Sequence, residues 1–359
     1  MNSRERLITA FEGRLPDRVP VTPRVDPKWM DNAGDAWAGR IIRETDIALY
    51  LDVVPDTVLY LGEAARRALS VTQGDGMRTE VIRTPNGPLT RTLSVEAEMM
   101  DWATVHFFGC ADDVGKALSL PLDPPEVDLS EYDAWERRIG DEGIVGVHLF
   151  DPLCCPGLWF SPEEYLIHAC VTHTELVEEL LVRVLENMVS FVQICLDRGV
   201  RHFLMAGAEL ACQTLMGPKW FSRLVTPYDA PLVDQVREGG GYVWYHCHGK
   251  IAHIHREMAD LGFHVLTPCE KPPHGDIELA ELKASVGHRV CLAGNLDDLD
   301  LLSSDRVDEI DRRAQECLAD AMDGGRFILA GTEGCVFSPQ NAEGYLRMCR
   351  VRDEVGCYV

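Results

Sequence analysis

Long apolar runs and secretory signals are both missing from this sequence. No uninterrupted apolar run reaches about 18 residues, the length that a membrane-spanning helix needs. The N-terminal segment MNSRERLITAFEGRLPDRVP also lacks the apolar core of a signal peptide. We therefore expect a cytoplasmic protein that does not enter a membrane.

Positive charge is scarce as well. The chain has 34 Lys and Arg against 58 Asp and Glu, which gives a formal net charge of −24 and a pI of about 4.8. A surface with this balance repels phosphate backbones and anionic lipid headgroups. We expect neither nucleic acid nor a membrane among the partners.

Linkers, low-complexity tracts and residue-level repeats are absent from the 359 residues. The simplest organisation is a single domain over residues 1–359, large enough to bury a substantial core. The thirteen cysteines are an odd number without the spacing of a small disulfide-bonded domain. In a reducing compartment we expect most of them to be buried thiols, including Cys154, Cys155, Cys170 and Cys195.

The first part of the chain predicts additions to a larger scaffold. Residues Asn2–Gly13 have one apolar face at helical spacing and predict an amphipathic helix that ends before Pro16. The run VPVTPRV (Val19–Val25) predicts a first strand. The segment Thr79–Val95 predicts a β-hairpin that turns at Asn86-Gly87.

From Ile144 onward, short β-rich runs alternate with longer helical segments. The runs are IVGVHLF, HFLMAG, YVWYH, HVLTP, VCLAG and FILAG. Such alternation is typical of a parallel sheet with crossover helices. No Gly-x-Gly-x-x-Gly follows an early strand, which disfavours a dinucleotide-binding fold. We predict the α/β class, with a (β/α)8 TIM-type barrel that carries N-terminal helical and β-hairpin additions.

The stretch YVWYHCHGK carries the strongest chemical signal, because it places His246 and His248 two residues apart at a strand end. Alternate side chains of a strand point to one face, so both imidazoles would project together. Neutral imidazole is a common zinc ligand, and a third soft ligand would leave an open position for chemistry.

The active site of such a barrel lies at the C-terminal ends of its strands. The other residues that directly follow the apolar runs are therefore candidates as well. They are Asp151, Glu209, Glu270, Asn295, Glu333 and Cys335.

Each signal also has a plainer interpretation. The two histidines alone are more often hydrogen-bonded residues than ligands, and Cys335 alone is more often a buried thiol. Glu209 and Glu270 fit helix-capping carboxylates, and Asn295 fits a residue that satisfies loop backbone.

Several ordered blocks resemble the uroporphyrinogen decarboxylase superfamily. They are RERLITAFEGRLPDRVPV, HFFGCADDVGKALSLPL, LMGPKWFSRLVTPYDAPLV, HCHGKI, LAGNLDDLDLL and EGCVFSPQNAEGYL. Within the superfamily, the chain is more similar to the corrinoid-linked methyltransferases, of the O-demethylase or coenzyme M methyltransferase type. The resemblance implies a TIM-type barrel, and relatives are often dimers, which makes a homodimer one expected assembly.

The resemblance also implies a zinc site. Methyltransferase members bind zinc through a His-x-Cys-Gly motif and a later Gly-Cys. Here His246-Cys247-His248-Gly249 falls on the first motif and Gly334-Cys335 on the second. His248 stands where the family has a cysteine, so the implied ligand set is His246, His248 and Cys335.

The decarboxylases of the superfamily share an N-terminal Arg-Gln-Ala-Gly-Arg motif that receives substrate carboxylates. The corresponding segment, TPRVDPKWM, offers only Arg24 and Lys28. Without paired arginines to hold a polycarboxylate, porphyrinogen decarboxylation is not expected.

Two imidazoles and one thiolate would leave a Zn²⁺ site with a charge near +1, whereas one imidazole and two thiolates would leave it neutral. The more electrophilic metal suits an ether or phenolic oxygen and weakens a bound thiolate nucleophile. This favours demethylation of a methoxylated, preferably aromatic, compound over methylation of a coenzyme M-like thiol. Glu209 and Glu333 are placed as a fourth ligand or general acid, and Asp151, Glu270 and Asn295 as substrate-binding residues.

The Asp-x-His-x-x-Gly signature of cobalt-ligating proteins is absent, so a corrinoid would have to arrive on a partner protein. Two other function classes stay open. One is a cofactor-free decarboxylase or lyase, and the other is a non-catalytic binding protein for a corrinoid carrier or a small aromatic compound.

Overall fold

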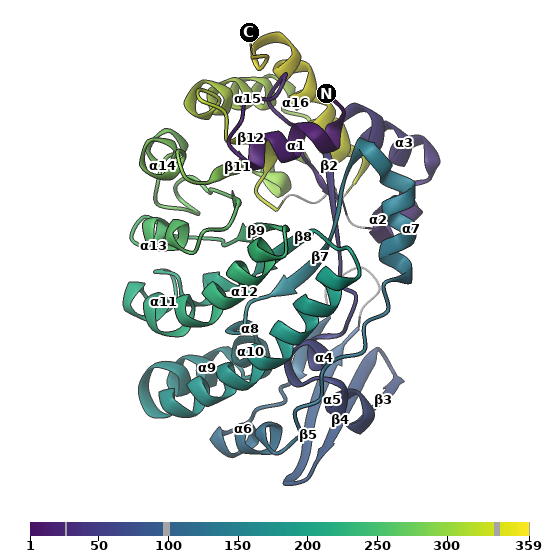
Figure 1. Cartoon of the computed structure of the whole chain (residues 1–359), viewed down its shortest axis with the longest axis vertical. Coiled ribbons are helices and arrows are strands. Elements are labelled where there is room, and N and C mark those ends of the chain that lie inside the picture. The colour runs from purple at the N-terminus through teal and green to yellow at the C-terminus, as the bar shows by residue number, and fades with distance from the viewer. Residues whose placement is uncertain (26, 96–100, 334–337, 359) are drawn as a thin grey trace.

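The structure of the chain is a computed structural model that describes residues 1–25, 27–95, 101–333 and 338–358. Over these residues, eight parallel strands curl in the order β1-β2-β7-β8-β9-β10-β11-β12 (Figure 1). Their bounds are β1 (Arg24–Val25), β2 (Ile47–Leu51), β7 (Gly143–Phe150), β8 (His202–Ala206), β9 (Tyr242–His246), β10 (Val265–Thr267), β11 (Cys291–Leu296) and β12 (Phe327–Gly331).

The sheet closes on itself between its first and last strands. Val21 forms a parallel bridge with Leu329 of β12, in the segment that leads into β1. The prediction of a (β/α)8 TIM-type barrel is confirmed. The predicted strand over Val19–Val25 is too long, because Pro20 and Pro23 lack the N–H groups that a continuous ladder needs.

Most of the helices lie on the outer side of the barrel, whereas α1 covers one of its ends (Figure 1). In chain order they are α1 (Ser3–Phe11), α2 (Pro27–Ala33), α3 (Asp35–Glu44), α4 (Asp56–Leu61), α5 (Glu63–Ala68), α6 (Ala111–Leu118), α7 (Ser130–Ile139), α8 (Cys154–Trp159), α9 (Pro162–Ile167), α10 (Thr174–Asp197), α11 (Pro218–Leu224), α12 (Thr226–Glu238), α13 (His255–Asp260), α14 (Leu279–Val286), α15 (Val307–Ala321) and α16 (Pro339–Val355). Short 3-10 turns are η1 (Gly140–Glu142) and η3 (Ala208–Ala211), and π turns are η2 (His168–Thr172) and η4 (Asp298–Leu302).

Helix α1 closes one end of the barrel, and its prediction is confirmed. A capping box starts the helix, since Asn2 Oδ1 accepts from the Glu5 N–H at 2.8 Å and Glu5 Oε2 accepts from the Asn2 N–H at 3.2 Å. Its apolar face packs against the inward-facing layer of the strands, which includes Ala48, Ile144, Leu204, Trp244, Val265, Ala293 and Ile328. The barrel interior at this end is therefore a packed core.

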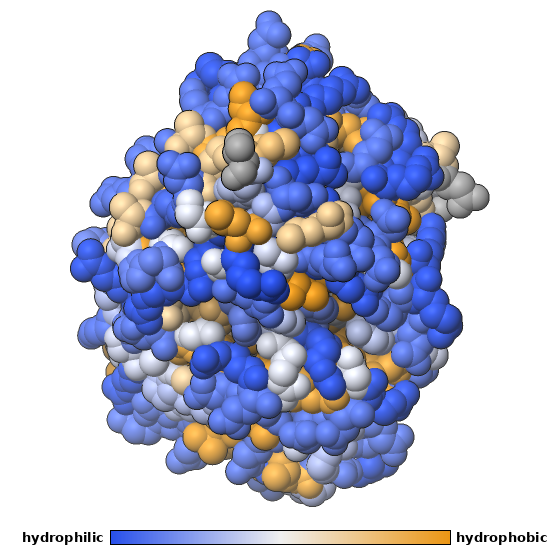
Figure 2. Space-filling view, turned by 45° about the horizontal axis from the view of Figure 1, so that its top comes forward, coloured by the Kyte–Doolittle hydropathy of each residue, from blue (hydrophilic) through white to orange (hydrophobic). Residues whose placement is uncertain are grey.

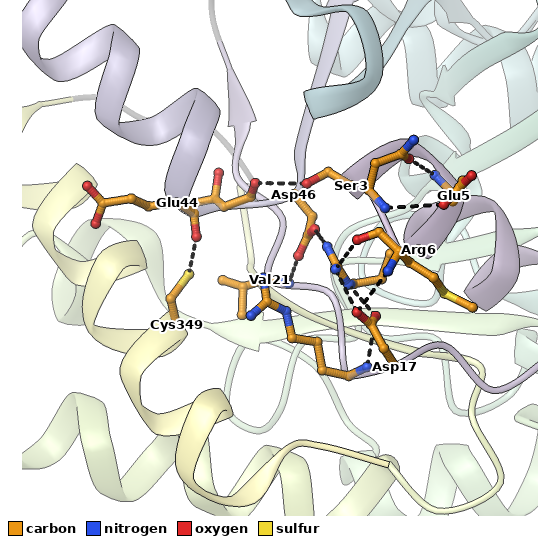
Figure 3. Close-up of polar contacts among 12 residues, drawn as sticks. Ser3, Glu5, Arg6, Asp17, Val21, Glu44, Asp46 and Cys349 are labelled. Carbon is orange, nitrogen blue, oxygen red and sulfur yellow. Dashed lines mark hydrogen bonds and ion pairs between the residues drawn. The ribbon is translucent and has the colours of Figure 1, made fainter. Parts of the chain in front are cut away.

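An ion-pair cluster attaches α1 to the first strands of the barrel (Figure 3); Arg6 and Asp46 are buried, whereas Asp17 is partly exposed. Arg6 Nη1 lies 2.5 Å from Asp46 Oδ1, and Arg6 Nε lies 2.6 Å from Asp17 Oδ1. The other Asp46 oxygen accepts from the Val21 N–H at 3.0 Å. The guanidinium of Arg6 holds the pKa of Asp17 well below its usual range. One arginine thus joins the helix to the segments that lead into β1 and β2.

A separate antiparallel sheet of β3 (Leu69–Gly74), β4 (Met77–Thr84), β5 (Gly87–Ser94) and β6 (Trp102–Val105) lies beside α4 and α5 (Figure 1). The predicted hairpin is confirmed, but its turn lies one residue earlier. Thr84 pairs with Gly87, so the turn residues are Pro85 and Asn86. Proline presets the backbone angle of a first turn residue, and Gly87 takes the positive φ of 119°.

The outer surface is rich in polar residues. The face shown in Figure 2 is mostly hydrophilic, with hydrophobic residues in separate small patches. Across the described residues, no helix combines the length and apolar character needed to cross a bilayer. The described cysteines are free thiols and most of them are buried, which confirms the prediction for Cys154, Cys155 and Cys195; Cys170, also predicted to be buried, is only half-buried.

Candidate functional site

The two histidines of the His-x-His motif lie together at the C-terminal end of β9. Their ring centroids are 4.5 Å apart and the rings meet edge to face at 87°. Trp244 and His246 line the barrel interior, whereas Tyr245 and Cys247 pack into the outer core. The strand alternation predicted from the sequence is therefore observed, including the buried position of Cys247 on the other side.

His248 lies between two carboxylates. Its Nδ1 is 3.2 Å from Glu270 Oε1, and its Nε2 is 3.6 Å from Glu333 Oε2. Glu270 is held in place because its other oxygen accepts from the Gly249 N–H at 2.6 Å. Burial opposes the charged imidazole, but the two carboxylates outweigh it and raise the pKa of His248 to about 10. At neutral pH this histidine is an imidazolium between two anions.

His246 has the opposite character. Its side chain is buried, and burial together with the positive charges of Arg24, His248 and His148 lowers its pKa well below the usual value. The neutral imidazole, which is the form that binds a metal, is therefore favoured. It lines a cavity inside the barrel together with Thr22, Arg24, Tyr50, Trp244, Thr267 and Glu333.

Glu209 lies in η3, directly after β8 (His202–Ala206). Burial raises the pKa of Glu209, while the charges of His248 and Glu270 also act on it. Its Oε2 is buried and has no hydrogen-bond partner within the described part of the chain. Glu209 is thus a neighbour of the His248 cluster and is suited to hold a proton.

Asp151 and Asn295 are not brought into contact with the histidines. Asp151 has no exposed surface; its Oδ1 accepts from the Cys154 N–H at 2.8 Å, and burial next to Asp229 and Glu209 raises its pKa well above the usual value. Asn295 Nδ2 donates to the Cys269 carbonyl at 2.8 Å. It borders a second cavity of about 190 Å³ that Glu270 also lines.

The third predicted metal ligand, Cys335, lies outside the described residues. Within the described ranges, no group of three His, Cys, Asp or Glu side chains is assembled to hold a metal ion. The donor chemistry nevertheless fits zinc, because a neutral imidazole and a second imidazole flanked by carboxylates are ligands that zinc accepts. A bound cation would replace the proton that His248 now carries.

Sequence reasoning missed a pair on a nearby part of the barrel mouth, at the ends of β2 and β7. His148 Nδ1 lies 2.8 Å from Asp52 Oδ1. Asp52 directly follows β2, a strand that the sequence analysis did not identify, and His148 lies inside the apolar run IVGVHLF. The signal available was the strand-end rule applied to the segment IALYLD.

Comparisons with known proteins bear on the family and the fold. Residues 163–344, just over half of the chain, match the model of the family described as "Uroporphyrinogen decarboxylase (URO-D)". Among solved structures, a methyltransferase from Methanosarcina mazei has a TM-score of 0.67 and 18% sequence identity, with 99% of each chain covered. A B12-independent methionine synthase from Shewanella sp. W3-18-1, solved in complex with selenomethionine, has a TM-score of 0.49 and 10% identity, over 94% of this chain and 97% of its own. No curated protein sequence matches the chain significantly.

Proposed function

The chain belongs to the uroporphyrinogen decarboxylase family, and we propose that it is a corrinoid-dependent methyltransferase of that family. In this proposal, a small methylated substrate gives its methyl group to a corrinoid held by a separate protein. A methoxylated, preferably aromatic, compound is the favoured substrate. The fold shared with the Methanosarcina mazei methyltransferase over 99% of both chains supports the proposal. We place the reaction in the cytoplasm and regard a homodimer as one assembly to test.

The observation that carries this proposal is the charge pattern around the two histidines. His248 lies between Glu270 and Glu333, and His246 beside it is neutral and buried. Two imidazoles among carboxylates form an electron-rich set of donors for a divalent cation.

Zinc is the cation that this set of donors fits. His246, His248 and Cys335 would hold it, with Glu209 or Glu333 as a fourth ligand. When bound, zinc would act as a Lewis acid toward the oxygen that loses its methyl group. For His248 to become a ligand, its ring must lose the proton that Glu270 and Glu333 stabilise.

Glu333 and Glu209, the two proposed acid–base residues, are suited to different roles. The pKa of Glu333 is lowered by its contact with His248, so this residue is an anion that suits a cation site. Burial raises the pKa of Glu209, so this residue is the better carrier of a proton. Glu270 and Asn295 are proposed to face substrate from the 190 Å³ cavity that they share. Asp151 is proposed to act through its charge interaction with Glu209, since it has no exposed surface.

The same charge pattern argues against a porphyrinogen decarboxylase. Carboxylates at the barrel mouth repel a polycarboxylate substrate, and Arg24 is the one arginine that lines the cavity beside His246 in the described residues. A thiol methyltransferase would share the proposed metal ligands, but it would move the methyl group from a methylated corrinoid to a thiol.

The test is anaerobic incubation with a panel of methoxylated aromatic compounds and reduced corrinoid proteins. Cobalt absorbance reports the methylated corrinoid. We expect methylation by the wild type and by His288→Ala, which alters an exposed histidine outside the site, and none by His246→Ala. A parallel assay supplies a methylated corrinoid protein and a thiol; methyl transfer in that assay alone would replace the favoured substrate with the thiol alternative. Release of CO₂ from a porphyrinogen without any methyl transfer would overturn the proposal.

A further inference from the structure

A third recess, separate from the His246 cavity and the 190 Å³ cavity, lies beside the barrel mouth, where β2 (Ile47–Leu51) and β7 (Gly143–Phe150) end. Its volume is about 160 Å³. Its walls combine apolar side chains with a histidine and two carboxylates: Asp52, Val54, Pro55, Asp56, Leu59, His148 and Phe150. None of the residues proposed above to bind metal lines this recess.

The histidine of the recess has a defined orientation. Strand register pairs Tyr50 with Gly146 and Leu51 with Val147, so Asp52 and His148 come next on neighbouring strands. The Asp52 carboxylate can only accept, so His148 Nδ1 donates to it across 2.8 Å. The second nitrogen, Nε2, is buried and has no hydrogen-bond partner among the described residues. It is the nitrogen left for a ligand.

The recess adjoins the proposed methyl-transfer site. His148 pairs in register with Leu204, and Leu204 pairs with Trp244. Leu204 and Trp244 both line the cavity that contains His246. Because only β8 separates β7 from β9, the two walls are roughly 10 Å apart at the backbone. One small molecule can therefore reach both His148 and the imidazole pair.

The size and lining of the recess suit one aromatic ring. A cavity of roughly 150 Å³ lined by apolar side chains is large enough for benzene. Phe150 lies 4.4 Å from the His148 ring, centroid to centroid, and extends the flat surface. The negative charge of the Asp56 carboxylate is balanced, because the carboxylate accepts hydrogen bonds from Arg91 at 2.7 and 3.1 Å and from the Trp159 indole at 3.0 Å. A neutral ring therefore meets little unpaired charge there.

We propose that the recess binds the ring of a monocyclic aryl methyl ether and that His148, oriented by Asp52, protonates the departing oxygen. The inference rests on the proposed methyl transfer. The bond between the methyl carbon and the oxygen breaks, and its electron pair stays on the oxygen. The proton on Nε2 of the His148 imidazolium moves to that oxygen and gives a phenol. The methyl group bonds to the reduced cobalt of the corrinoid, which supplies the electron pair, and His148 regains a proton from water.

The first test compares leaving groups, with free cob(I)alamin as the methyl acceptor. In His148→Gln we expect kcat for 4-methoxyphenol to fall about 100-fold or more, as for loss of a general acid. For 4-nitroanisole, whose phenolate leaves without a proton, we expect a fall of less than about 3-fold. KM should stay unchanged for both ethers. Asp52→Asn should lower kcat less than His148→Gln does, and again more for 4-methoxyphenol than for 4-nitroanisole. His288→Gln serves as the matched control.

An equal fall in kcat for both ethers in His148→Gln would overturn the proposed role of His148 as proton donor. The same leaving-group pattern in Glu209→Gln instead of His148→Gln would also overturn it, by assigning the proton to Glu209.

The second test measures ring binding without turnover. Ligand-observed NMR should detect saturable phenol binding to the wild type, which Val54→Phe abolishes by filling the recess. Val53→Phe, a change at the neighbouring half-buried valine outside the recess, should bind phenol like the wild type. Equal phenol binding in all three proteins, or none in the wild type, would overturn the ring site. If no methylated donor reacts with any corrinoid yet phenol binds as expected, the proposed function fails while the ring site stands.

Discussion

Replacement of the buried Asp229 by asparagine is expected to stabilise the protein, and to do so increasingly as the pH rises. Asp229 lies on α12 (Thr226–Glu238) and has no exposed surface. One carboxylate oxygen accepts from the Tyr245 hydroxyl at 2.6 Å, and the other has no hydrogen-bond partner within the described residues. Burial raises the pKa of Asp229 from 3.8 to about 7, although the Tyr245 hydrogen bond opposes the shift.

The magnitude follows from proton linkage. The folded protein binds this proton more tightly than the unfolded chain, so its stabilising effect is complete below pH 3.8 and is lost as the pH rises through about 7. The shift of about 3 units, at about 1.4 kcal/mol each, corresponds to a loss of about 4 kcal/mol at high pH. An asparagine can still accept from Tyr245 and carries no charge. Its advantage over aspartate should therefore grow by about 2 kcal/mol between pH 5.5 and pH 8.

Urea unfolding of the wild type and Asp229→Asn at both pH values is the assay. Asp234→Asn, an exposed change on the same helix, is the matched control and should change stability little at either pH. A difference between wild type and Asp229→Asn that is the same at both pH values would refute the reasoning. So would a variant that is less stable than the wild type at pH 8.

Two further predictions concern the fold. Arg6→Met should lower the free energy of unfolding by about 3–5 kcal/mol, because it leaves the buried Asp46 carboxylate without its closest charge partner. The control Arg14→Met, an exposed change, should lower it by less than about 1 kcal/mol. Equal effects of the two changes in denaturant titrations would contradict this prediction. Gly207→Ala should destabilise more than Gly199→Ala in thermal unfolding. Both glycines have positive φ, 126° and 91°, but only a Cβ at Gly207 would meet other atoms, at 2.1 Å from a buried sulfur; similar melting temperatures would contradict it.

The features that the sequence predicted well are local ones. The His-x-His spacing and the period of two in YVWYH place both imidazoles at one strand end without reference to the rest of the fold. The alternation of strands and helices from Ile144 likewise identifies the barrel. Cys335, by contrast, lies outside the described residues, so its part in the site stays a prediction.

The features that escaped prediction depend on contacts distant in sequence. The strand-end rule placed Glu270 and Glu333 near the mouth, but their pairing with His248 depends on three separate loops. The contact between Asp52 and His148 depends on the register of β2 against β7, across 96 positions of sequence. No period or motif encodes such a register.

The zinc content of the purified protein tests the central claim most directly. We expect about one zinc per chain in the wild type and in His288→Ala, measured by elemental analysis of protein prepared without chelators. His246→Ala, His248→Ala and Cys335→Ser should each lose most of it, because each removes one of the proposed donors. Zinc-free wild type that transfers methyl groups, or equal zinc in all of these proteins, would contradict the account.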